Sequence, residues 1–465
     1  MALRFNNTMT RKLEEFQPIE EGKVGLYTCG PTVYDFAHIG NFRAYIFEDI
    51  LKRYLRYKGY DVYHVMNLTD IDDKTIKGCQ KESVSLDEYT ERYKNAFFDD
   101  IDALRIDRAD VYPEATKHID EMVAMVKALL DKDIAYESGN AIYFSIAKFP
   151  EYGKLSHMDM TQLKAGARVT SDEYEKEQVS DFALWKGWDE DDGPVFWQTE
   201  LGKGRPGWHI ECSAMSMKYL GPHFDIHCGG VDNMFPHHEN EIAQSVASTG
   251  KKFVNYWMHN EHLIVEGRKM SKSFGNFYTL RQILEKGYPA LAVRYVLMST
   301  HYRQQLNFTF DALDAAKAAI ERLWDFKDNV GAIKGGKDNS DVDKYIQTAR
   351  SKFEESLDDD LNISPALAAV FDFVRDINRL IHEKNISASD GAKVLEVMKE
   401  FDGVLAVMEK EVEDIGSEVE DLIQKRLDAR KNRDFATADK IRDDLLERGI
   451  LLEDTPDGTK WKRKL

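Results

Sequence analysis

The amino-acid sequence predicts an α/β protein: a doubly wound parallel sheet with an inserted connective domain, followed by an α-helical bundle and a small C-terminal α+β domain. Two apolar stretches that suit buried strands, residues 24–27 and 61–66, are each followed by a helical pattern. Alternating strands and helices are typical of a parallel sheet, and the alternation returns after residue 200. From residue 288 to about residue 408 the apolar residues recur at helical spacing alone, which indicates a bundle.

The composition is that of a globular protein with a large core. The chain has 465 residues, of which 43% are hydrophobic and 31% charged, and a chain of this length forms about three domains. No apolar run approaches the roughly 18 residues that span a membrane, and the N-terminus has no apolar signal segment. We therefore expect a cytoplasmic location and no membrane partner. The four cysteines are too few and too far apart for a disulfide framework, which leaves free thiols or metal ligands.

The net charge of −19 is only a weak argument against a nucleic-acid partner. Net charge governs solubility, whereas binding depends on local patches. Residues 425–465 carry a surplus of Lys and Arg over Asp and Glu, so the acidic residues are concentrated elsewhere. The net charge therefore does not exclude a nucleic acid as a partner of the C-terminal residues.

Residues 1–111 are expected to form the first half of the α/β domain. They begin with a short leader, residues 1–22, that could include an edge strand. Gly30-Pro31 ends the first strand, and the second strand ends in the polar and acidic loop 67–73. Open α/β sheets bind ligands where their strands end, so the segment 27–41 is the expected ligand site.

Residues 112–200 interrupt the alternation and are expected to form an insertion between the two halves of the sheet. The insertion should contain one helix at 114–132, short strands near 141–145 and an acidic stretch at 171–178. The second half of the α/β domain is expected over residues 201–300. Its elements are a strand, a helix, a second strand and a glycine-bounded cationic loop, at residues 224–227, 236–248, 253–259 and 267–276.

Two further domains are expected after the sheet. Residues 301–410 should form the bundle, with helices near 311–329, 341–357, 365–384 and 389–408. An acidic linker is expected at 412–420. Residues 421–465 should then form a small domain with a highly charged helical segment and a short strand. Asp457-Gly458 is a hairpin signal within it.

Four side chains could together hold a zinc ion: Cys29, Cys212, His237 and Glu241. His237 and Glu241 are four residues apart in a helical pattern and share a face. Two thiolates, an imidazole and a carboxylate can complete a tetrahedral zinc site. The four are far apart in sequence, so unrelated residues, with the two cysteines as small core hydrophobes, are the alternative. His238 and Cys228 are plausible substitutes for two of them.

Two motifs are suited to binding a nucleoside triphosphate. In His38-Ile-Gly-Asn41, a glycine beside an imidazole at a helix N-terminus lets backbone N–H groups and a donor side chain meet phosphate. In Lys269-Met-Ser-Lys-Ser273, two lysines on a loop can neutralise the charge of a leaving pyrophosphate. A plain helix cap and a solvated basic turn are the alternatives. The two motifs occur in this order in one α/β chain, which favours the nucleotide interpretation.

With this pair of motifs the chain resembles the class I aminoacyl-tRNA synthetases, specifically the cysteinyl-tRNA synthetases. The resemblance runs essentially end to end. It rests on six stretches: YTCGPTVYD (27–35), NLTDIDDK (67–74), GRPGWHIECSAM (204–215), MFPHHENEIA (234–243), KMSKS (269–273) and LEDTPDGT (452–459).

The resemblance implies a Rossmann-like synthetase core that ligates L-cysteine to tRNA(Cys) through a cysteinyl-adenylate, with Mg-ATP as a substrate. It implies one zinc ion per chain, held by the four residues named above, that binds the thiolate of cysteine. Zinc binds sulfur well and lowers the pKa of a thiol, whereas the hydroxyl of serine is a poorer ligand. A hydrolytic editing domain would then be unnecessary, and the insertion at 112–200 is too short for one. The expected partners are L-cysteine, ATP and tRNA(Cys), with the chain as a monomer.

The resemblance also implies roles for single residues. The catalytic residues would be His38, Asn41, Lys269 and Lys272, with Lys272 as the main lysine. ATP would contact Gly40, Gly229, Gly230, Asp232 and Lys272, of which Gly229, Gly230 and Asp232 form the ribose-binding turn. Cysteine would contact Thr69, Trp208 and His209, and ordinary core packing is the alternative role of Trp208.

Two residues depart from the family pattern. Asn41 replaces the usual histidine, and an asparagine can donate a hydrogen bond to phosphate but cannot carry charge. Cys228 stands where a glycine is expected. It is either a structural thiol or a residue that alters the metal site.

The helical region 301–410 and the basic C-terminus resemble the tRNA-binding domains of the family, of which residues 421–465 would bind the anticodon. Cations next to aromatic rings suit splayed bases, which stack on the rings and pair with fixed donors. The expected tRNA contacts are Arg430, Arg433, Phe435 and Trp461. A solvated helix and a packed tryptophan are the alternative.

Two other functions remain open. A cysteine ligase of the mycothiol pathway shares the adenylating core and the zinc ligands, but it uses an amino-sugar acceptor and lacks an anticodon module. The presence of residues 421–465 argues against it. A catalytically inactive synthetase paralogue could act as an RNA-binding or regulatory protein. The intact Lys269–Ser273 motif and the full ligand set argue against that function.

Overall fold

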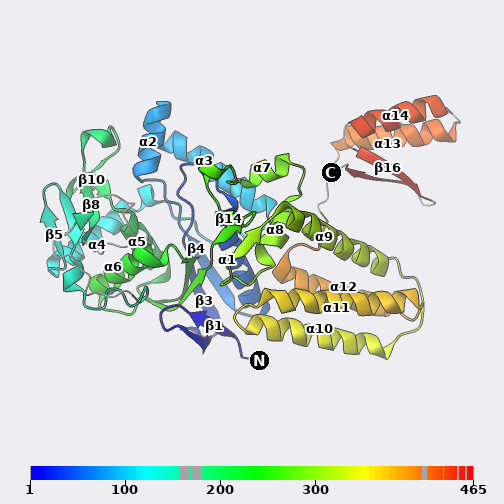
Figure 1. Cartoon of the computed structure of the whole chain (residues 1–465), viewed down its shortest axis with the longest axis horizontal. Coiled ribbons are helices and arrows are strands. Elements are labelled where there is room, and N and C mark those ends of the chain that lie inside the picture. Colours follow the sequence, from blue (N-terminus) through cyan, green and yellow to red (C-terminus); the bar gives the residue numbers. More distant parts are fainter. Residues whose placement is uncertain are drawn as a thin grey trace. The chain divides into compact units, whose positions relative to one another are not determined.

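The computed structural model describes residues 2–157, 168–169, 181–410, 416–432, 434–447, 450–455 and 458–463. The acidic stretch expected at 171–178 and part of the expected linker lie outside these residues. The chain divides into two compact units (Figure 1): Met1–Ile283 with Pro289–Met408, and Leu284–Tyr288 with Glu409–Leu465. No helix in the described part of the chain combines the length and apolar content needed to cross a membrane.

The first unit is built on a sheet of four parallel strands, which confirms the predicted fold class. The strand order is β12 (Val254–Asn260), β11 (Phe224–Gly230), β3 (Lys23–Thr28) and β4 (Asp61–Met66). The strands are apolar and buried on both faces, as parallel strands between helices are. The two halves of the chain meet where β3 pairs with β11, and each half winds outward from there. The carboxyl ends of β3 and β11 therefore open a crevice at the point where the strand order reverses.

Helices cover both faces of the sheet (Figure 1). α1 (Ile39–Tyr57) packs against β4, β11 and β12, while α5 (Trp208–Leu220) packs against β3 and β4 from the other face. α6 (Glu239–Thr249) packs beside α5 and leads into β12. α1 and α6 both begin at the carboxyl end of a strand, so the N-termini of both helices lie near the crevice.

The insertion forms a mainly antiparallel sheet, and α4 (Ile119–Asp131) packs against one of its edge strands. Its strands, in spatial order, are β5 (Ala135–Ser138), β6 (Ala141–Phe144), β8 (Asp181–Gly187), β10 (Gly202–Pro206) and β9 (Trp197–Thr199), and β7 (Arg168–Val169) pairs with β8. β10 extends this sheet beyond residue 200, where we expected the insertion to end.

The helix expected at 114–132 is interrupted. A short 3-10 turn, Ala115–Lys117, comes first, and α4 starts only at Ile119. Between them the imidazole of His118 is hydrogen-bonded to the carbonyl of Glu114 at 2.7 Å and to the hydroxyl of Tyr219 at 3.0 Å. These bonds hold His118 out of helical geometry, and residue spacing alone does not reveal them.

The helical bundle follows the sheet, with all four predicted helices present. They are α9 (Phe310–Gly331), α10 (Ser340–Asp358), α11 (Ile363–His382) and α12 (Ala388–Leu405). The side chains of Thr309, Asn339 and Ser387 cap α9, α10 and α12, each accepting a backbone N–H of the first turn.

The connection from the sheet to the bundle contains several short elements. One helix, Ala290–Met298, falls within the helical pattern expected from residue 288, whereas a shorter helix and a small sheet were not predicted. Its helices are α7 (Leu280–Glu285) and α8 (Ala290–Met298). A small sheet joins β14 (Arg268–Lys269), β13 (Leu263–Val265) and β15 (Leu306–Phe308). The first residues of the expected bundle are therefore a strand, because β15 finds a parallel partner in β13 more than forty residues earlier.

Within its described residues, the second unit contains two helices and a hairpin in addition to the short segment Leu284–Tyr288. α13 (Gly416–Lys431) and α14 (Phe435–Glu447) pack together, and β16 (Ile450–Thr455) pairs antiparallel with β17 (Gly458–Arg463). The pairing of Thr455 with Gly458 confirms the predicted hairpin. Ala438, Leu445 and Ile450 are buried in the small core of this unit.

Two helices follow β4 and complete the first half of the sheet domain before the insertion begins. α2 (Asp73–Glu82) begins directly after the acidic loop at the end of β4, and α3 (Leu86–Ala103) follows it. The carboxylate of Asp72 caps α2 by accepting the backbone N–H of Thr75 at 2.7 Å. The acidic character of this loop therefore has a structural cause in addition to its position at a strand end.

Candidate active site and metal centre

A cavity of about 940 Å³ opens at the carboxyl ends of β3 and β11. Its lining comes from the loop between β3 and α1, the first turns of α1 and α5, the end of β11 and the segment 260–270. Twelve of the residues that the sequence singled out line this one cavity: Cys29, His38, Gly40, Asn41, Thr69, Trp208, Cys212, Gly229, Gly230, Asp232, His237 and Lys269. The crevice between the two halves of the sheet thus gathers residues that lie more than two hundred positions apart.

The four proposed zinc ligands lie together, and three of them, Cys29, Cys212 and His237, line the cavity. One donor atom from each of Cys29, Cys212, His237 and Glu241 lies within 4.8 Å of every other. Nε2 of His237 is 3.1 Å from Oε1 of Glu241. That carboxylate oxygen is buried and makes no hydrogen bond within the described residues. The donor set fits a zinc ion, which would give this oxygen a partner.

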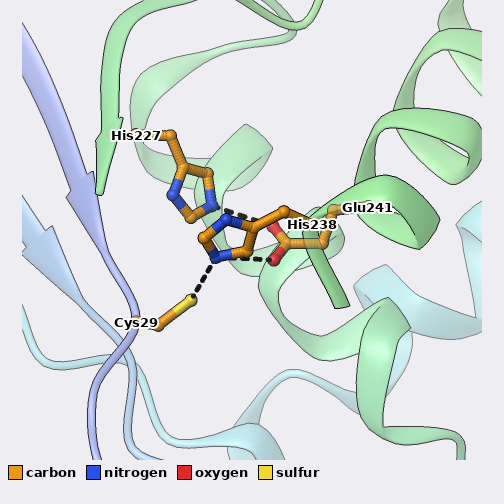
Figure 2. Close-up of side chains that lie close together, drawn as sticks. All are labelled: Cys29, His227, His238 and Glu241. Carbon is orange, nitrogen blue, oxygen red and sulfur yellow. Dashed lines mark hydrogen bonds and ion pairs between the residues drawn. The ribbon is translucent and has the colours of Figure 1, made fainter. Parts of the chain in front are cut away.

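A second group of possible metal ligands shares Cys29 and Glu241 with the first and adds His227 and His238. Figure 2 shows the two imidazoles facing the Glu241 carboxylate, with Cys29 at the end of its strand. Nε2 of His227 is hydrogen-bonded to Oε2 of Glu241 at 3.0 Å, and Nε2 of His238 lies 3.2 Å from the sulfur of Cys29. The sequence identified His238 as a substitute ligand but did not identify His227.

The two groups differ in their access to the cavity. Cys29, Cys212 and His237 line the cavity, whereas His227 and His238 are fully buried behind it. Catalytic zinc sites keep one position open for substrate, whereas structural sites are closed by protein ligands. This difference favours the first group as the place where a substrate could reach a metal.

Aromatic and imidazole neighbours fix the orientation of His237. The ring of Trp208 stacks on it with centroids 4.2 Å apart, and Nδ1 of His209 is hydrogen-bonded to its Nδ1 at 2.9 Å. With Nδ1 engaged by His209, Nε2 of His237 is left to face Glu241. His209 itself lies behind His237 and is absent from the cavity lining within the described residues.

The pKa values of the ligands in the first group, Cys29, Cys212, His237 and Glu241, depend on one another. Burial opposes ionisation of Cys212, but a hydrogen bond from Cys29 and the charge of His237 outweigh it and hold the pKa of Cys212 well below its usual value. The same hydrogen bond, together with burial, raises the pKa of Cys29. Burial and then the Cys212 thiolate raise the pKa of Glu241. A divalent cation would supply the positive charge that lets all three groups ionise, and its binding would release protons.

Cys228 belongs to neither group of ligands. Its side chain is fully buried, and its carbonyl accepts a hydrogen bond from the backbone N–H of Cys29 at 3.4 Å. Cys228 therefore contributes to the junction of β11 with the end of β3. Of its two possible roles, this position favours the structural thiol.

The motif His38–Asn41 forms a reciprocal cap at the start of α1. The backbone N–H of His38 donates to Oδ1 of Asn41 at 3.1 Å, and the backbone N–H of Asn41 donates to Nδ1 of His38 at 3.2 Å. A side chain on Gly40 would lie 2.9 Å from the His38 ring and 3.2 Å from the methyl carbon of Met270. The glycine is therefore required by the close approach of these two groups.

The ribose-binding turn that we expected is partly strand. β11 continues through Gly229 and Gly230, and Asp232 follows it at the cavity. A Cβ on Gly229 would lie only 2.7 Å from the ring of His238. The glycine thus lets the strand end pass directly over the buried imidazole.

The cationic loop is held in a tight turn beside the cavity. Lys269 lies in β14 and lines the cavity, and Lys272 begins a short 3-10 helix that ends at Phe274. The side chain of Asn276 accepts from the backbone N–H of Ser271 at 2.8 Å and donates to the carbonyl of Lys269 at 3.1 Å. These bonds close the turn across its base.

Thr69 is oriented by two polar neighbours that the sequence did not single out. Its hydroxyl donates to Oε2 of Glu211 at 3.1 Å and accepts from the Asn67 amide at 3.2 Å. Glu211 is fully buried on α5, one residue before Cys212. Asn67 and Glu211 both lie in the stretches that carry the family resemblance, which was the available signal.

The expected tRNA contacts lie in the second unit. Phe435 is 62% exposed at the start of α14, and Arg430 lies near the end of α13. Trp461 belongs to β17, and Arg433 lies outside the described residues. An exposed phenylalanine beside a basic helix end is available to a ligand.

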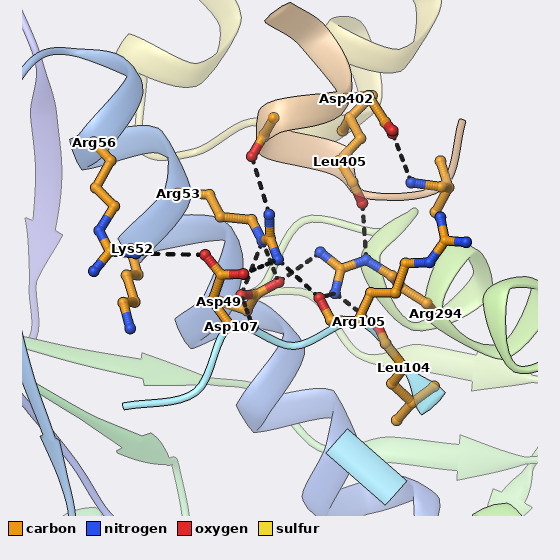
Figure 3. Close-up of polar contacts among 12 residues, drawn as sticks. Asp49, Lys52, Arg53, Arg56, Leu104, Arg105, Asp107, Arg294, Asp402 and Leu405 are labelled. Carbon is orange, nitrogen blue, oxygen red and sulfur yellow. Dashed lines mark hydrogen bonds and ion pairs between the residues drawn. The ribbon is translucent and has the colours of Figure 1, made fainter. Parts of the chain in front are cut away.

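A buried charge network holds α1, and with it the motif His38–Asn41, against the rest of the first unit (Figure 3). Arg294 of α8 is fully buried and donates to Asp49 of α1 at 2.6 Å. It also donates to the carbonyls of Leu405 at 2.8 Å and Leu104 at 3.0 Å. Asp49 in addition accepts from Arg53 at 2.9 Å. One carboxylate thus joins α1 to α8, whose arginine reaches the end of α12.

Asp49→Ala is expected to lower the free energy of unfolding by about 3–5 kcal/mol, because it leaves the Arg294 guanidinium buried without a counter-charge. Urea unfolding followed by circular dichroism measures the change. The matched control is Glu20→Ala, which breaks a 2.6 Å ion pair with Lys23 between side chains that are 66% and 60% exposed. The control should cost at most about 1 kcal/mol. Equal effects of the two substitutions would contradict the assigned role of Asp49.

Comparisons with known proteins agree with this architecture. The family of tRNA synthetases class I (C) catalytic domains matches residues 15–318, the DALR domain family matches 352–409, and the cysteinyl-tRNA ligase anticodon binding domain family matches 412–461. The methionyl-tRNA synthetase of Mycobacterium tuberculosis, solved with methionyl-adenylate, has a similar fold with a TM-score of 0.59 and 15% identity, over 83% of this chain and 90% of that one.

Full-length relatives share about half of their residues with this chain. A cysteine–tRNA ligase of Protochlamydia amoebophila is 51% identical over 100% of this chain and 98% of the relative. A cysteine–tRNA ligase of Brachyspira hyodysenteriae is 50% identical over 99% of both chains. The resemblance predicted from the sequence motifs is confirmed: the chain belongs to the cysteine–tRNA ligase family of class I aminoacyl-tRNA synthetases.

Proposed function

We propose that this member of the family joins L-cysteine to tRNA(Cys) in two steps, through a cysteinyl-adenylate, and selects the thiol with one zinc ion per chain. One observation supports the proposal above all. The donor cluster of Cys29, Cys212 and His237 borders the same cavity as the capped N-terminus of α1. The proposed thiol-selecting residues and the proposed phosphate-binding residues thus line one cavity.

The zinc ligands of the proposal are Cys29, Cys212, His237 and Glu241. A zinc ion held there would bind the thiolate of cysteine and reject the hydroxyl of serine, which is a poorer ligand and harder to ionise. Trp208 and His209 keep the His237 ring in place, and Thr69 lies on the cavity wall near the amino acid. Selection by a coordinate bond exceeds what a difference of one methylene gives, which removes the need for an editing domain.

The first step is attack of the cysteine carboxylate on the α-phosphate of ATP, with departure of pyrophosphate. We assign His38, Gly40 and Asn41 to the phosphates, because all three line the cavity at the N-terminus of α1, where the positive end of the helix dipole favours an anion. Gly229, Gly230 and Asp232 are assigned to the ribose. Lys269 and Lys272 neutralise the leaving pyrophosphate. These residues position reactants and stabilise charge, and none of them forms a covalent intermediate.

The second step is attack of the terminal ribose hydroxyl of tRNA on the adenylate. We assign tRNA binding to residues 301–410 and anticodon binding to residues 421–465, with 1–111 and 201–300 as the catalytic halves around the connective insertion 112–200. The proposed anticodon contacts are Arg430, Arg433, Phe435 and Trp461. Exposed rings beside cations give bases a surface for stacking.

Cysteine-dependent exchange between ATP and pyrophosphate, followed by transfer to tRNA(Cys), tests the proposal. Both activities are expected. Exchange without transfer to tRNA would instead support an amino-sugar acceptor, as in a mycothiol-pathway ligase. Absence of exchange would leave an RNA-binding or regulatory protein. The assay therefore separates the three functions in one series of measurements.

Substitutions of Asn41 can separate its role as a helix cap from its proposed role as a hydrogen-bond donor to phosphate. Asn41→Ala should lower the rate of exchange roughly tenfold to a hundredfold, because it removes a donor from the phosphate site. Asn41→Asp retains the oxygen that accepts the His38 N–H but places negative charge toward the phosphates, so it should lose at least as much activity while keeping stability. Asn41→His should retain exchange. If Asn41→Asp were as active as the unsubstituted chain, the side chain would serve only as a cap.

A further inference from the structure

One wall of the active-site cavity is aromatic and has no role in the assignments of cysteine and ATP above. We call it the aromatic wall: Tyr34 and Phe36 on the loop before α1, and Tyr93 on α3, all of which line the cavity. Phe36 is 38% exposed. Its ring meets that of Tyr93 nearly at a right angle, with centroids 5.4 Å apart and an interplanar angle of 78°. A large ring is thus held at the cavity with much of its surface open to solvent.

Two arginines beside the aromatic wall are engaged with acidic side chains. The guanidinium of Arg281 lies 5.3 Å from the centroid of Phe36, and it pairs with Asp99 at 3.3 Å and Asp100 at 3.2 Å. The guanidinium of Arg92 lies 4.8 Å from the centroid of Tyr93 and pairs with a carboxylate of α2. Because both arginines are paired with carboxylates, they add little net positive charge beside Phe36 and Tyr93, and the exposed part of the Phe36 ring is open to a ligand. This chemistry suits a planar base better than a phosphate.

The wall is also rigid. The hydroxyl of Tyr89 donates to the carbonyl of Tyr34 at 2.8 Å, and its ring packs against Tyr93 with centroids 5.2 Å apart. Lys74 lies over the Tyr34 ring at 5.0 Å. Rings that are fixed before a ligand arrives lose little conformational entropy when a base stacks on them.

The position of the aromatic wall indicates which base could stack on it. Phe36 lies two residues before His38, on the loop that begins at Cys29. One short loop thus carries Cys29 of the proposed zinc site, Phe36 of the aromatic wall and His38 of the proposed phosphate site. In the second step of the proposed function, a terminal ribose must reach the carboxyl group between those two sites. The base attached to that ribose needs an apolar surface next to them, and the aromatic wall provides one.

We propose that the aromatic wall stacks the terminal adenine of the single-stranded 3′ end of tRNA during transfer. The proposal rests on the proposed function, since it assigns a place to the acceptor of its second step. Stacking of a base on an aromatic side chain changes binding by about ten- to a hundredfold. The effect should fall on transfer and not on formation of the adenylate.

The test uses the full-length protein and tRNA(Cys) with 2-aminopurine in place of the terminal adenine. Phe36→Ala and Phe36→Leu should each lose the fluorescence change on binding, and the ratio of single-turnover transfer rate to exchange rate should fall by about ten- to a hundredfold. Phe36→Leu keeps apolar bulk without a ring face, and Phe36→Tyr, which keeps the ring, should restore both readouts. Tyr63→Ala is the matched control, because Tyr63 is 41% exposed on β4 and lies outside the cavity lining.

The outcomes separate this inference from the function on which it rests. Transfer and fluorescence at control levels in Phe36→Ala would overturn the inference. Activity of Phe36→Leu equal to that of Phe36→Tyr would also overturn it, because apolar shielding without stacking would then suffice. Absence of cysteine-dependent exchange in the unsubstituted protein would overturn the proposed function instead, and the fluorescence readout would still report whether the wall binds the base.

Discussion

Cys212→Ser is expected to abolish tight zinc binding and to raise the KM for cysteine in ATP–pyrophosphate exchange by at least about a hundredfold, since loss of even an indirect partner of a metal ligand costs up to that much. Cys212 is fully buried, lines the cavity and has a pKa held well below its usual value by its hydrogen bond with Cys29 and the charge of His237. Serine matches its size but does not ionise in that place. Metal content is measured by mass spectrometry of the purified protein, and the preference for cysteine over serine should fall together with it.

The two groups of possible metal ligands make this experiment sharper. Cys212 and His237 belong only to the first group, whereas His227 and His238 belong only to the second. If the zinc ion occupied the second group, His238→Gln would lose the metal and Cys212→Ser would retain it. Cys228→Ser is the matched control, because it replaces a fully buried thiol that belongs to neither group. It should keep about one zinc ion per chain, as a site with a complete set of four ligands does.

The strands and helices of the catalytic domain were predictable where their signal is local. The segment 61–66 is a strand with the predicted bounds, and α1 begins within the motif His38–Asn41. Both could be predicted because an apolar run and a helix cap each depend only on residues that are adjacent in the sequence. The break at His118 was not predictable, since it depends on a hydrogen bond to Tyr219 a hundred residues later. β15 was missed for the same reason, because its strand conformation depends on pairing with β13.

The candidate site shows the same division between local and distant information. His237 and Glu241 could be paired from their spacing alone, because a helix places residues four apart on one face. His227 could not, since its contact with Glu241 depends on how α6 lies against the strand β11 that carries His227. The aromatic wall is a further case: its rings come from a loop and from α3, and only the tertiary structure brings them to one cavity.

Deletion of residues 411–465 is expected to lower kcat/KM for aminoacylation of tRNA(Cys) by roughly a hundredfold or more, while cysteine-dependent exchange stays within about twofold. The loss corresponds to about two stacked bases at 1–3 kcal/mol each. Exchange should persist because the cavity and its lining belong entirely to the first unit, which has its own core. Ending the chain at Lys410 also keeps the bonds from the Asp402 carboxylate to the backbone N–H groups of Val407 and Met408, both at 2.7 Å.

Two full-length variants show whether the loss comes from recognition or from damage at the cut end. Phe435→Ala and Arg430→Ala leave the chain whole, and the exposure of Phe435 means that its removal opens no cavity in the core. Each should lower kcat/KM for aminoacylation about five- to a hundredfold through KM, with exchange unchanged, because each removes one stacking or cationic contact. A shortened chain that aminoacylates tRNA at the full rate would show that the second unit has another role. Loss of exchange and transfer in equal proportion would show that the second unit supports the catalytic domain itself, since recognition of tRNA acts only after the adenylate has formed.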